Sequence, residues 1–213
     1  MAGGAREVRR RAYHVRPAAI IKRMPNAEGA MAALWGAWWL SWFAAAWWRD
    51  RAAAAPPWYE QIGYRICAGL GVVLLFGAFR LNARSEGVLW QTPPAVAWAL
   101  VAVAGAGFAF TWWARLHLGR LWSTNVGRKA EHHVVDTGPY GIVRHPIYTG
   151  ITLASIAVAA LRGTAAAWLG AAVMTLGWYV KARLEERFLR EQLGADAYGA
   201  YARRVPMLVP FLR

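Results

Sequence analysis

The segment GPYGIVRHPIYTG (residues 138–150) joins the longest polar stretch after the N-terminus to an apolar run that continues to Leu161. Turn-forming residues begin it, and Pro146 fits the first turn of a helix, where no backbone N–H donor is needed. Polar side chains at the mouth of an apolar helix cost free energy and are usually retained for a function. The segment therefore predicts helices that lie in a membrane, with polar chemistry at the membrane border.

The composition favours a membrane protein. The 213 residues are 58% hydrophobic, include 14 Trp and carry a formal charge of +14. High apolarity and high basicity coexist when apolar spans alternate with basic loops. Nucleic-acid binding is disfavoured, because the charges lie between apolar runs rather than along one surface. The single cysteine, Cys67, excludes an internal disulfide and a thiolate metal cluster.

The apolar runs divide the chain into a basic N-terminal arm (1–28), a region of three spans (29–113) and a C-terminal region (114–213). The arm is Arg-rich and lacks the short apolar stretch and cleavage site of a signal peptide. The expected spans, each long enough for ~30 Å of hydrocarbon, are Gly29 to Trp48, Gln61 to Phe79 and Ala95 to Trp113. The first is so rich in tryptophan that we expect some of these rings to face other helices or a second protomer.

Two short apolar helices, Tyr148 to Leu161 and Ala165 to Val180, surround a turn at residues 162–164, which is typical of a tight helical hairpin. An amphipathic helical region is expected from Lys181 to Tyr201, with a break at Gly194. The expected fold is an all-α integral membrane protein with about five transmembrane helices, the last two forming the hairpin, and a C-terminal amphipathic helix. Basic loops weakly favour a cytoplasmic tail, whereas the basic arm favours the opposite orientation.

The Arg-His-Pro sequence at residues 144–146 places ionisable groups at a helix start. His145 falls near the N-cap, and Tyr148 and Thr152 follow on the same face. The free amides and the macrodipole of a helix start favour an anion, and Arg144 adds a bidentate partner for a carboxylate or a phosphate. On these residues alone, the alternative is an interfacial anchor in which Tyr148 is a belt residue.

Two adjacent carboxylates, Glu185 and Glu186, stand at the end of the last apolar helix. They could hold a cation, or accept hydrogen bonds from an amine or a ribose. The alternative is a solvated helix face, because Lys181 and Arg190 lie four residues from these carboxylates.

Two further patterns do not predict a site, and one glycine predicts a close contact. A metal site at His132-His133 is not expected, because neighbouring side chains on a helix point apart and only Asp136 lies at ligand spacing. Gly105-Ala106-Gly107 resembles a dinucleotide loop, but it lies inside the third apolar span. Gly150 allows another helix or a ligand to approach closely.

Taken together, the ordered motifs resemble the isoprenylcysteine carboxyl methyltransferase family over roughly Arg115 to Phe211. The stretches that carry the resemblance are Leu118-Gly119, Trp122-Ser123, residues 133–140, residues 144–150, Glu185-Glu186, Tyr198, Tyr201, Arg204-Val205-Pro206 and Pro210-Phe211. The N-terminal spans match only as apolar helices, and the basic arm has no counterpart in the resemblance.

The resemblance implies an integral membrane methyltransferase that uses S-adenosylmethionine without a Rossmann fold and keeps its catalytic face in the cytoplasm. A lipophilic or prenylated acceptor would enter from the lipid bilayer, and the reaction most similar is carboxyl O-methylation of an isoprenylcysteine. Alternatives that share the fold are phospholipid N-methyltransferases, small-thiol S-methyltransferases and NADPH-dependent sterol-type reductases. A non-enzymatic scaffold is disfavoured, because every matching position retains a polar residue. The acceptor and the oligomeric state stay open.

The resemblance also implies roles for individual residues. The cofactor would be enclosed between residues 133–150 and the helix that carries the two carboxylates. The residues expected to bind it are His133, Val135, Gly138, Tyr140, His145, Tyr148 and Glu185. Arg144 and Glu186 are expected to be catalytic. Arg144 would orient an anionic acceptor, and Glu186 or His133 would be the base for an amine or a thiol, whereas a carboxylate acceptor needs none.

Overall fold

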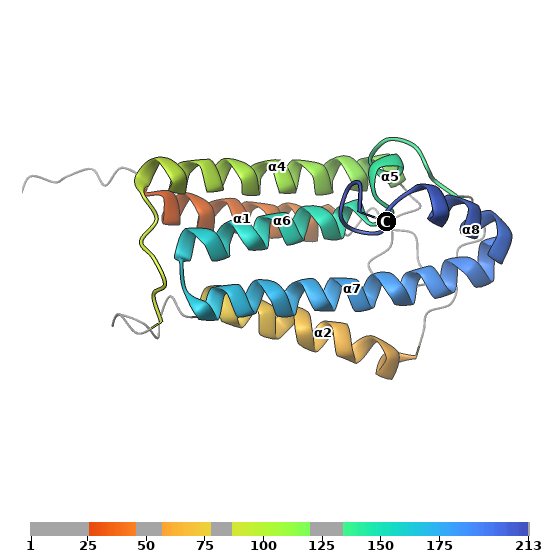
Figure 1. Cartoon of the computed structure of the whole chain (residues 1–213), viewed down its shortest axis with the longest axis horizontal. Coiled ribbons are helices and arrows are strands. Elements are labelled where there is room, and N and C mark those ends of the chain that lie inside the picture. The colour runs from red at the N-terminus through yellow and green to blue at the C-terminus, as the bar shows by residue number, and fades with distance from the viewer. Residues whose placement is uncertain (1–25, 46–56, 78–86, 120–133, 213) are drawn as a thin grey trace, which may run out of the picture.

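The computed structural model describes residues 26–45, 57–77, 87–119 and 134–212 (Figure 1). In chain order the elements are α1 (Ala27–Ala44), α2 (Trp58–Val72), the π-helical turn η2 (Val73–Gly77), α4 (Pro94–Leu118), α5 (Pro139–Ile142), α6 (Pro146–Arg162), α7 (Ala165–Leu193) and α8 (Ala195–Arg204). The described residues contain no strand beyond an isolated bridge between Val88 and Thr164. The expected all-α class is confirmed for this part of the chain.

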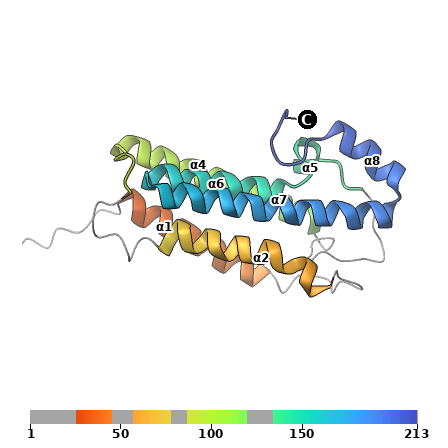
Figure 2. The same ribbon diagram turned by 60° about the horizontal axis from the view of Figure 1, so that its bottom comes forward.

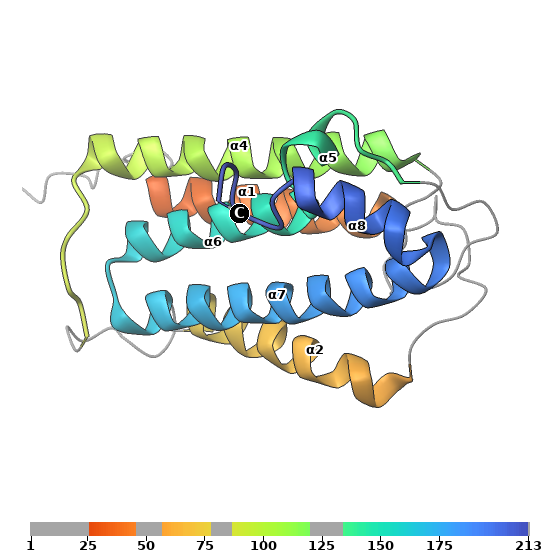
Figure 3. The same cartoon turned by 45° about the vertical axis from the view of Figure 1, so that its right-hand side comes forward.

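The long helices α1, α2, α4, α6 and α7 run side by side, and α5 and α8 lie at one end (Figures 1 and 3). A turned view shows two layers, with α4, α6 and α7 in one and α1 and α2 in the other (Figure 2). Helix α6 packs between α4 and α7, while α2 packs on α7 and α1 on α4. Because α6 and α7 are antiparallel, the N-terminus of α6 lies beside the C-terminal part of α7.

The predicted apolar spans are helical wherever the structure describes them. Among the described residues, α4 is the one helix that is long and apolar enough to cross a membrane, judged by length and composition, and α6 is a shorter apolar helix. Helix α4 begins with Pro94 at N1 and continues past the expected end to Leu118. The number of helices that cross a membrane stays a prediction.

Helices α6 and α7 form the predicted hairpin. Gly163 ends α6 with a φ of 58°, a left-handed conformation that favours glycine, and the Thr164 side chain caps α7 by accepting the N–H of Ala167 at 3.2 Å. The expected boundary at Lys181 was wrong. Helix α7 continues without interruption to Leu193, because no proline breaks it, so the apolar and amphipathic parts share one helix. The break at residue 194 is confirmed.

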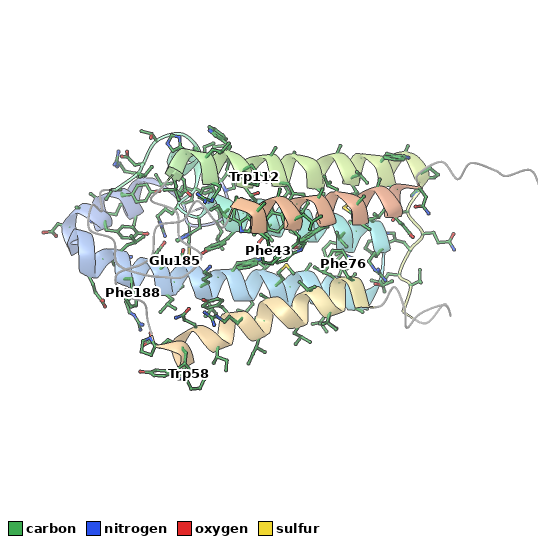
Figure 4. All side chains as sticks on the ribbon, turned by 180° about the vertical axis from the view of Figure 1, so that it is seen from behind. Phe43, Trp58, Phe76, Trp112, Glu185 and Phe188 are labelled. Carbon is green, nitrogen blue, oxygen red and sulfur yellow. The ribbon has the colours of Figure 1, made fainter. Side chains whose placement is uncertain are left out.

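Aromatic rings from α1 fill the core. Trp35 and Trp38 are buried, and the Trp38 ring stacks on Phe108 at a centroid distance of 4.9 Å. Phe76 points from η2 toward α1, where its ring meets Trp35 edge to face (Figure 4). The indole N–H of Trp38 donates to Thr111 Oγ1 at 2.9 Å. The expectation that some tryptophans of the first span face other helices is therefore confirmed.

Helices α4 and α6 meet backbone to backbone at Gly107 and Gly150. A Cβ atom added to Gly107 would lie 2.6 Å from the carbonyl oxygen of Gly150, and one added to Gly150 would lie 2.6 Å from Cγ2 of Thr111. Small residues permit such close helix crossings. Gly150 thus admits another helix, and the Gly105-Ala106-Gly107 sequence lies in a helix interior, as expected.

Candidate functional site

Five of the predicted site residues come together where the start of α6 meets the polar part of α7, residues 181–193. Arg144 and His145 directly precede α6, and Tyr148 lies in its first turn. Glu185 and Glu186 are successive residues of α7, and Figure 4 shows Glu185 on the side of α7 that faces the bundle. The antiparallel hairpin brings these segments into contact. We call these five residues the charge cluster.

His145 lies between the two carboxylates and is the N-cap residue of α6, as predicted. Its Nδ1 atom is 3.6 Å from Glu185 Oε2, and its Nε2 atom is 3.3 Å from Glu186 Oε1. The side chain of His145 is only 6% exposed. One imidazole therefore bridges two neighbouring carboxylates away from bulk water.

The pKa values of this group shift in opposite directions. Burial by itself would lower the pKa of His145, but the hydrogen bonds and charges of Glu185 and Glu186 outweigh it and raise the pKa. Burial would raise the pKa of each carboxyl, but His145, with Lys181 beside Glu185 and Arg144 beside Glu186, lowers both. The three groups lie beyond the apolar part of α7. Their arrangement stabilises an imidazolium between two carboxylates.

Arg144 connects α7 with the C-terminal end of α8. Its Nε atom donates to Glu186 Oε1 at 2.7 Å, and its Nη1 atom donates to the carbonyl oxygens of Ala202 at 2.8 Å and Val205 at 2.7 Å. The same guanidinium lines a cavity of about 380 Å³ together with Arg190 and Arg203. Arg144 is thus fixed by hydrogen bonds and also faces an open, cationic space.

Two members of the charge cluster, His145 and Tyr148, form a stack of three rings with Trp178 of α7. The rings of His145 and Tyr148 are 5.6 Å apart and 11° from parallel, and those of Tyr148 and Trp178 are 5.3 Å apart and 6° from parallel. The hydroxyl of Tyr148 donates to Glu185 Oε1 at 2.6 Å. The stack therefore links α6 with α7 and orients one carboxylate.

Lys181 is buried against the same carboxylate, with 8% of its surface exposed. Its Nζ atom lies 3.9 Å from Glu185 Oε1, 5.3 Å from the centre of the Tyr148 ring and 5.4 Å from the centre of the Tyr64 ring. Glu186 is 4% exposed. The alternative of a solvated helix face is therefore wrong, because packing against α2 and α6 removes these charges from water.

The other predicted cofactor residues lie around α5. Tyr140 is buried, its carbonyl oxygen accepts the hydroxyl of Tyr201 at 2.7 Å, and its ring stacks on His117. Gly138 has a φ of 56°, and a Cβ there would lie 2.8 Å from the His117 ring. Val135 is half-buried. His133 lies outside the described residues, as do the 1–25 part of the basic arm and Trp122-Ser123.

Sequence reasoning missed Tyr64 and Trp178 and treated Lys181 only as a solvated partner. Trp178, Lys181 and Glu185 recur at three- and four-residue spacing, so they share one face of α7, and this pattern could have revealed two of them. Tyr64 had no comparable signal, since its place depends on the packing of α2 against α7.

Two buried polar atoms lack a hydrogen-bond partner within the described part of the chain: Nε1 of Trp178, a member of the stack, and Oγ1 of Thr152, which lies one helical turn after Tyr148 on α6. Buried polar groups are usually paired, so such atoms are available to a ligand. No group of three or more His, Cys, Asp or Glu side chains placed to hold a metal ion occurs in the described ranges.

Over the residues that the structure describes, the fold and the site define a helical bundle that carries a buried cluster of ionisable groups at one end. Residues 98–191 match the model of the Isoprenylcysteine carboxyl methyltransferase (ICMT) family. The resemblance that the motifs indicated is therefore confirmed over this stretch.

The names of two relatives are also those of methyltransferases. Methanethiol S-methyltransferase 1 of Bradyrhizobium diazoefficiens is 33% identical over 72% of this chain and 55% of its own length. Protein-S-isoprenylcysteine O-methyltransferase B of Arabidopsis thaliana is 32% identical over 52% of this chain and 51% of its own length. The chain thus spans about half the length of these two relatives. The structure of a eukaryotic intramembrane Ras methyltransferase ICMT has a similar fold, with a TM-score of 0.58, 19% identity and coverage of 90% of this chain and 69% of that chain.

Proposed function

We propose that this protein is an integral membrane methyltransferase that transfers a methyl group from S-adenosylmethionine to a lipophilic acceptor. The observation that carries the proposal is the charge cluster. Residues more than thirty positions apart in the sequence, all belonging to the motifs of the resemblance, meet at one buried site. Buried ionisable groups cluster at functional sites more often than elsewhere.

The described residues fit a cofactor with a cationic amine, a ribose and a carboxylate. Glu185 would accept hydrogen bonds from the amine or the ribose, and His145 and Tyr148 would meet the carboxylate. Thr152 Oγ1 and Trp178 Nε1 offer further hydrogen-bonding atoms beside them. The aromatic stack presents π faces, which attract cations such as a sulfonium. Val135, Gly138 and Tyr140 would line the nucleoside together with His133.

The cofactor would supply a methyl group on a sulfonium centre, and the protein would align the acceptor. Arg144 would orient an anionic acceptor, since its guanidinium is fixed by Glu186 and faces the cavity that it shares with Arg190 and Arg203. Glu186 would take the proton from an amine or a thiol. Alignment in a site shielded from water lowers the barrier to displacement.

The surface of the bundle suits a lipid environment. Exposed apolar side chains follow the outer face of α2 and the start of η2 at helical spacing, namely Trp58, Ile62, Ile66, Leu70 and Val73. Trp58 points away from the bundle (Figure 4). We propose that this face and α4 contact lipid and that the end carrying α5 and α8 faces the cytoplasm.

The acceptor class is proposed from the relatives. Carboxyl O-methylation of an isoprenylcysteine is one candidate, and S-methylation of a small thiol is the second. The alignment with the methanethiol enzyme extends over more of this chain, which supports keeping a small thiol as the alternative to the lipophilic acceptor. N-methylation of a phospholipid remains an outcome of the test.

The test is calorimetric titration of the detergent-purified protein with S-adenosylmethionine, its demethylated product and NADPH. We expect the first two to bind, and binding of NADPH alone would refute the proposal in favour of a reductase. Transfer of labelled methyl groups to a farnesylated cysteine analogue, a short alkanethiol and phosphatidylethanolamine then identifies the acceptor.

A further inference from the structure

The chain that follows α8 runs back past the start of α6 (Figure 3). The backbone N–H of Arg144 donates to the carbonyl of Pro206 at 2.8 Å, and that of His145 donates to the carbonyl of Met207 at 3.1 Å. The hydroxyl of Thr149 donates to the carbonyl of Leu208 at 2.6 Å. We call residues 205–208 the tail strap.

The strap also holds the Arg144 side chain. The guanidinium donates to Val205 of the strap and to Ala202 in the last turn of α8. The last carbonyls of a helix have no partner within the helix and lie at the negative end of its dipole, so a cation is favoured there. Backbone and side chain of one residue are thus fixed by the same segment.

We propose that the tail strap is a positioning element of the active site, which holds Arg144 and His145 in place through its main-chain carbonyls. The strap lies beyond residues 98–191, the region that matches the family model. Because every acceptor is a main-chain carbonyl, the function depends on the path and length of the strap rather than on its side chains. The inference rests on the proposed function for its activity readout, but its structural readout is independent of it.

Two truncations test this inference. One chain ends at Val205 and loses the carbonyls of residues 206–208. The matched control ends at Val209 and loses only residues 210–213, which include the fully exposed Phe211. Hydrogen exchange of the peptide containing the amides of Arg144 and His145 is followed by mass spectrometry, together with S-adenosylmethionine affinity and methyl transfer.

We expect exchange at residues 144–145 to accelerate at least about tenfold in the chain ending at Val205, and cofactor affinity to fall by a similar factor. The chain ending at Val209 should behave like the full chain. A synthetic peptide of residues 206–213, added in excess, should restore protection and activity, which a merely misfolded protein would not show.

Equal effects of the two truncations, or unchanged exchange in the shorter chain, would overturn the inference. If the shorter chain does not fold in detergent, Thr149→Val removes the hydroxyl that donates to the carbonyl of Leu208 at 2.6 Å and to that of His145 at 3.2 Å, whereas Thr149→Ser keeps it. Exchange at residue 145 should accelerate in Thr149→Val but not in Thr149→Ser, and unchanged exchange in Thr149→Val would refute the strap. If the full chain does not bind S-adenosylmethionine, the proposed function fails, while the exchange measurement still decides the role of the strap.

Discussion

Arg144 and Glu186, which are 42 residues apart, form a part-buried ion pair in which Nε and Oε1 are 2.7 Å apart. The pair connects the start of α6 with α7. Nε2 of His145 lies 3.3 Å from the same Glu186 oxygen. Removing one member of a buried pair leaves the other charge without its partner, which is strongly destabilising. Both residues therefore stabilise the fold of the site as well as having a proposed catalytic role.

Arg144→Ala and His145→Ala should separate catalysis from cofactor binding. We expect Arg144→Ala to reduce turnover by at least about a hundredfold, because the acceptor loses its orienting charge. Cofactor affinity should fall less in Arg144→Ala than in His145→Ala, which removes a proposed cofactor contact. Calorimetry and methyl-transfer rates check this, and equal losses of affinity would refute the division of roles.

Stability should depend on pH through the charge cluster. The pKa of His145 is raised above 6.5 by folding, so its stabilising contribution is complete below pH 6.5 and is lost as the pH rises through the folded pKa. The pKa values of Glu185 and Glu186 are lowered from 4.5, so their contribution is present above pH 4.5 and is lost as the pH falls through the folded values. Thermal unfolding midpoints in detergent should therefore be highest between pH 4.5 and 6.5.

The variant His145→Gln provides the control for this profile. It lacks the titrating imidazole, so the decline on the alkaline side should flatten while other alkaline transitions persist. If the unfolding midpoint of His145→Gln falls with rising pH as it does in the unmodified chain, another group causes the decline.

The crossing of α4 and α6 predicts a sharp contrast between two glycines. Gly150→Ala should destabilise the protein by about 1–3 kcal/mol, because its Cβ would press on the backbone of Gly107 and on Thr111. Gly105→Ala lies in the same helix as Gly107, but the nearest atom to its Cβ would be Leu34 Cδ2 at 3.9 Å, so it should be neutral or slightly stabilising. Thermal unfolding of both variants in one detergent tests the contrast.

The ring of Tyr64 should stabilise the protein through its cation–π contact with Lys181. Tyr64→Phe keeps the ring, whereas Tyr64→Leu removes it, and we expect the second to be less stable than the first by about 0.5–2 kcal/mol. This difference should disappear in a Lys181→Met background if the cation–π contact causes it. A difference of the same size in both backgrounds would instead point to loss of packing volume.

Several features could be predicted because their causes are local. Pro146 begins α6, Gly163 reverses the chain, and residue 194 ends α7, since each acts through its own backbone conformation. The ordered motifs also indicated that Arg144, His145 and the two carboxylates belong to one site. Hydrophobic run lengths located the helices, although they placed a boundary inside the continuous helix α7.

The sequence by itself determined the helical architecture, because run lengths and short-range spacing specify helices, and its ordered motifs indicated the residues of the charge cluster through their resemblance to a family. Only the tertiary structure decided that Lys181 is buried, that α4 and α6 touch at Gly107 and Gly150, and that main-chain carbonyls of residues 205–208 hold Arg144 and His145. Burial depends on which helices pack together. Every residue has the same main-chain carbonyl acceptor, so no pattern of side chains could have predicted the tail strap.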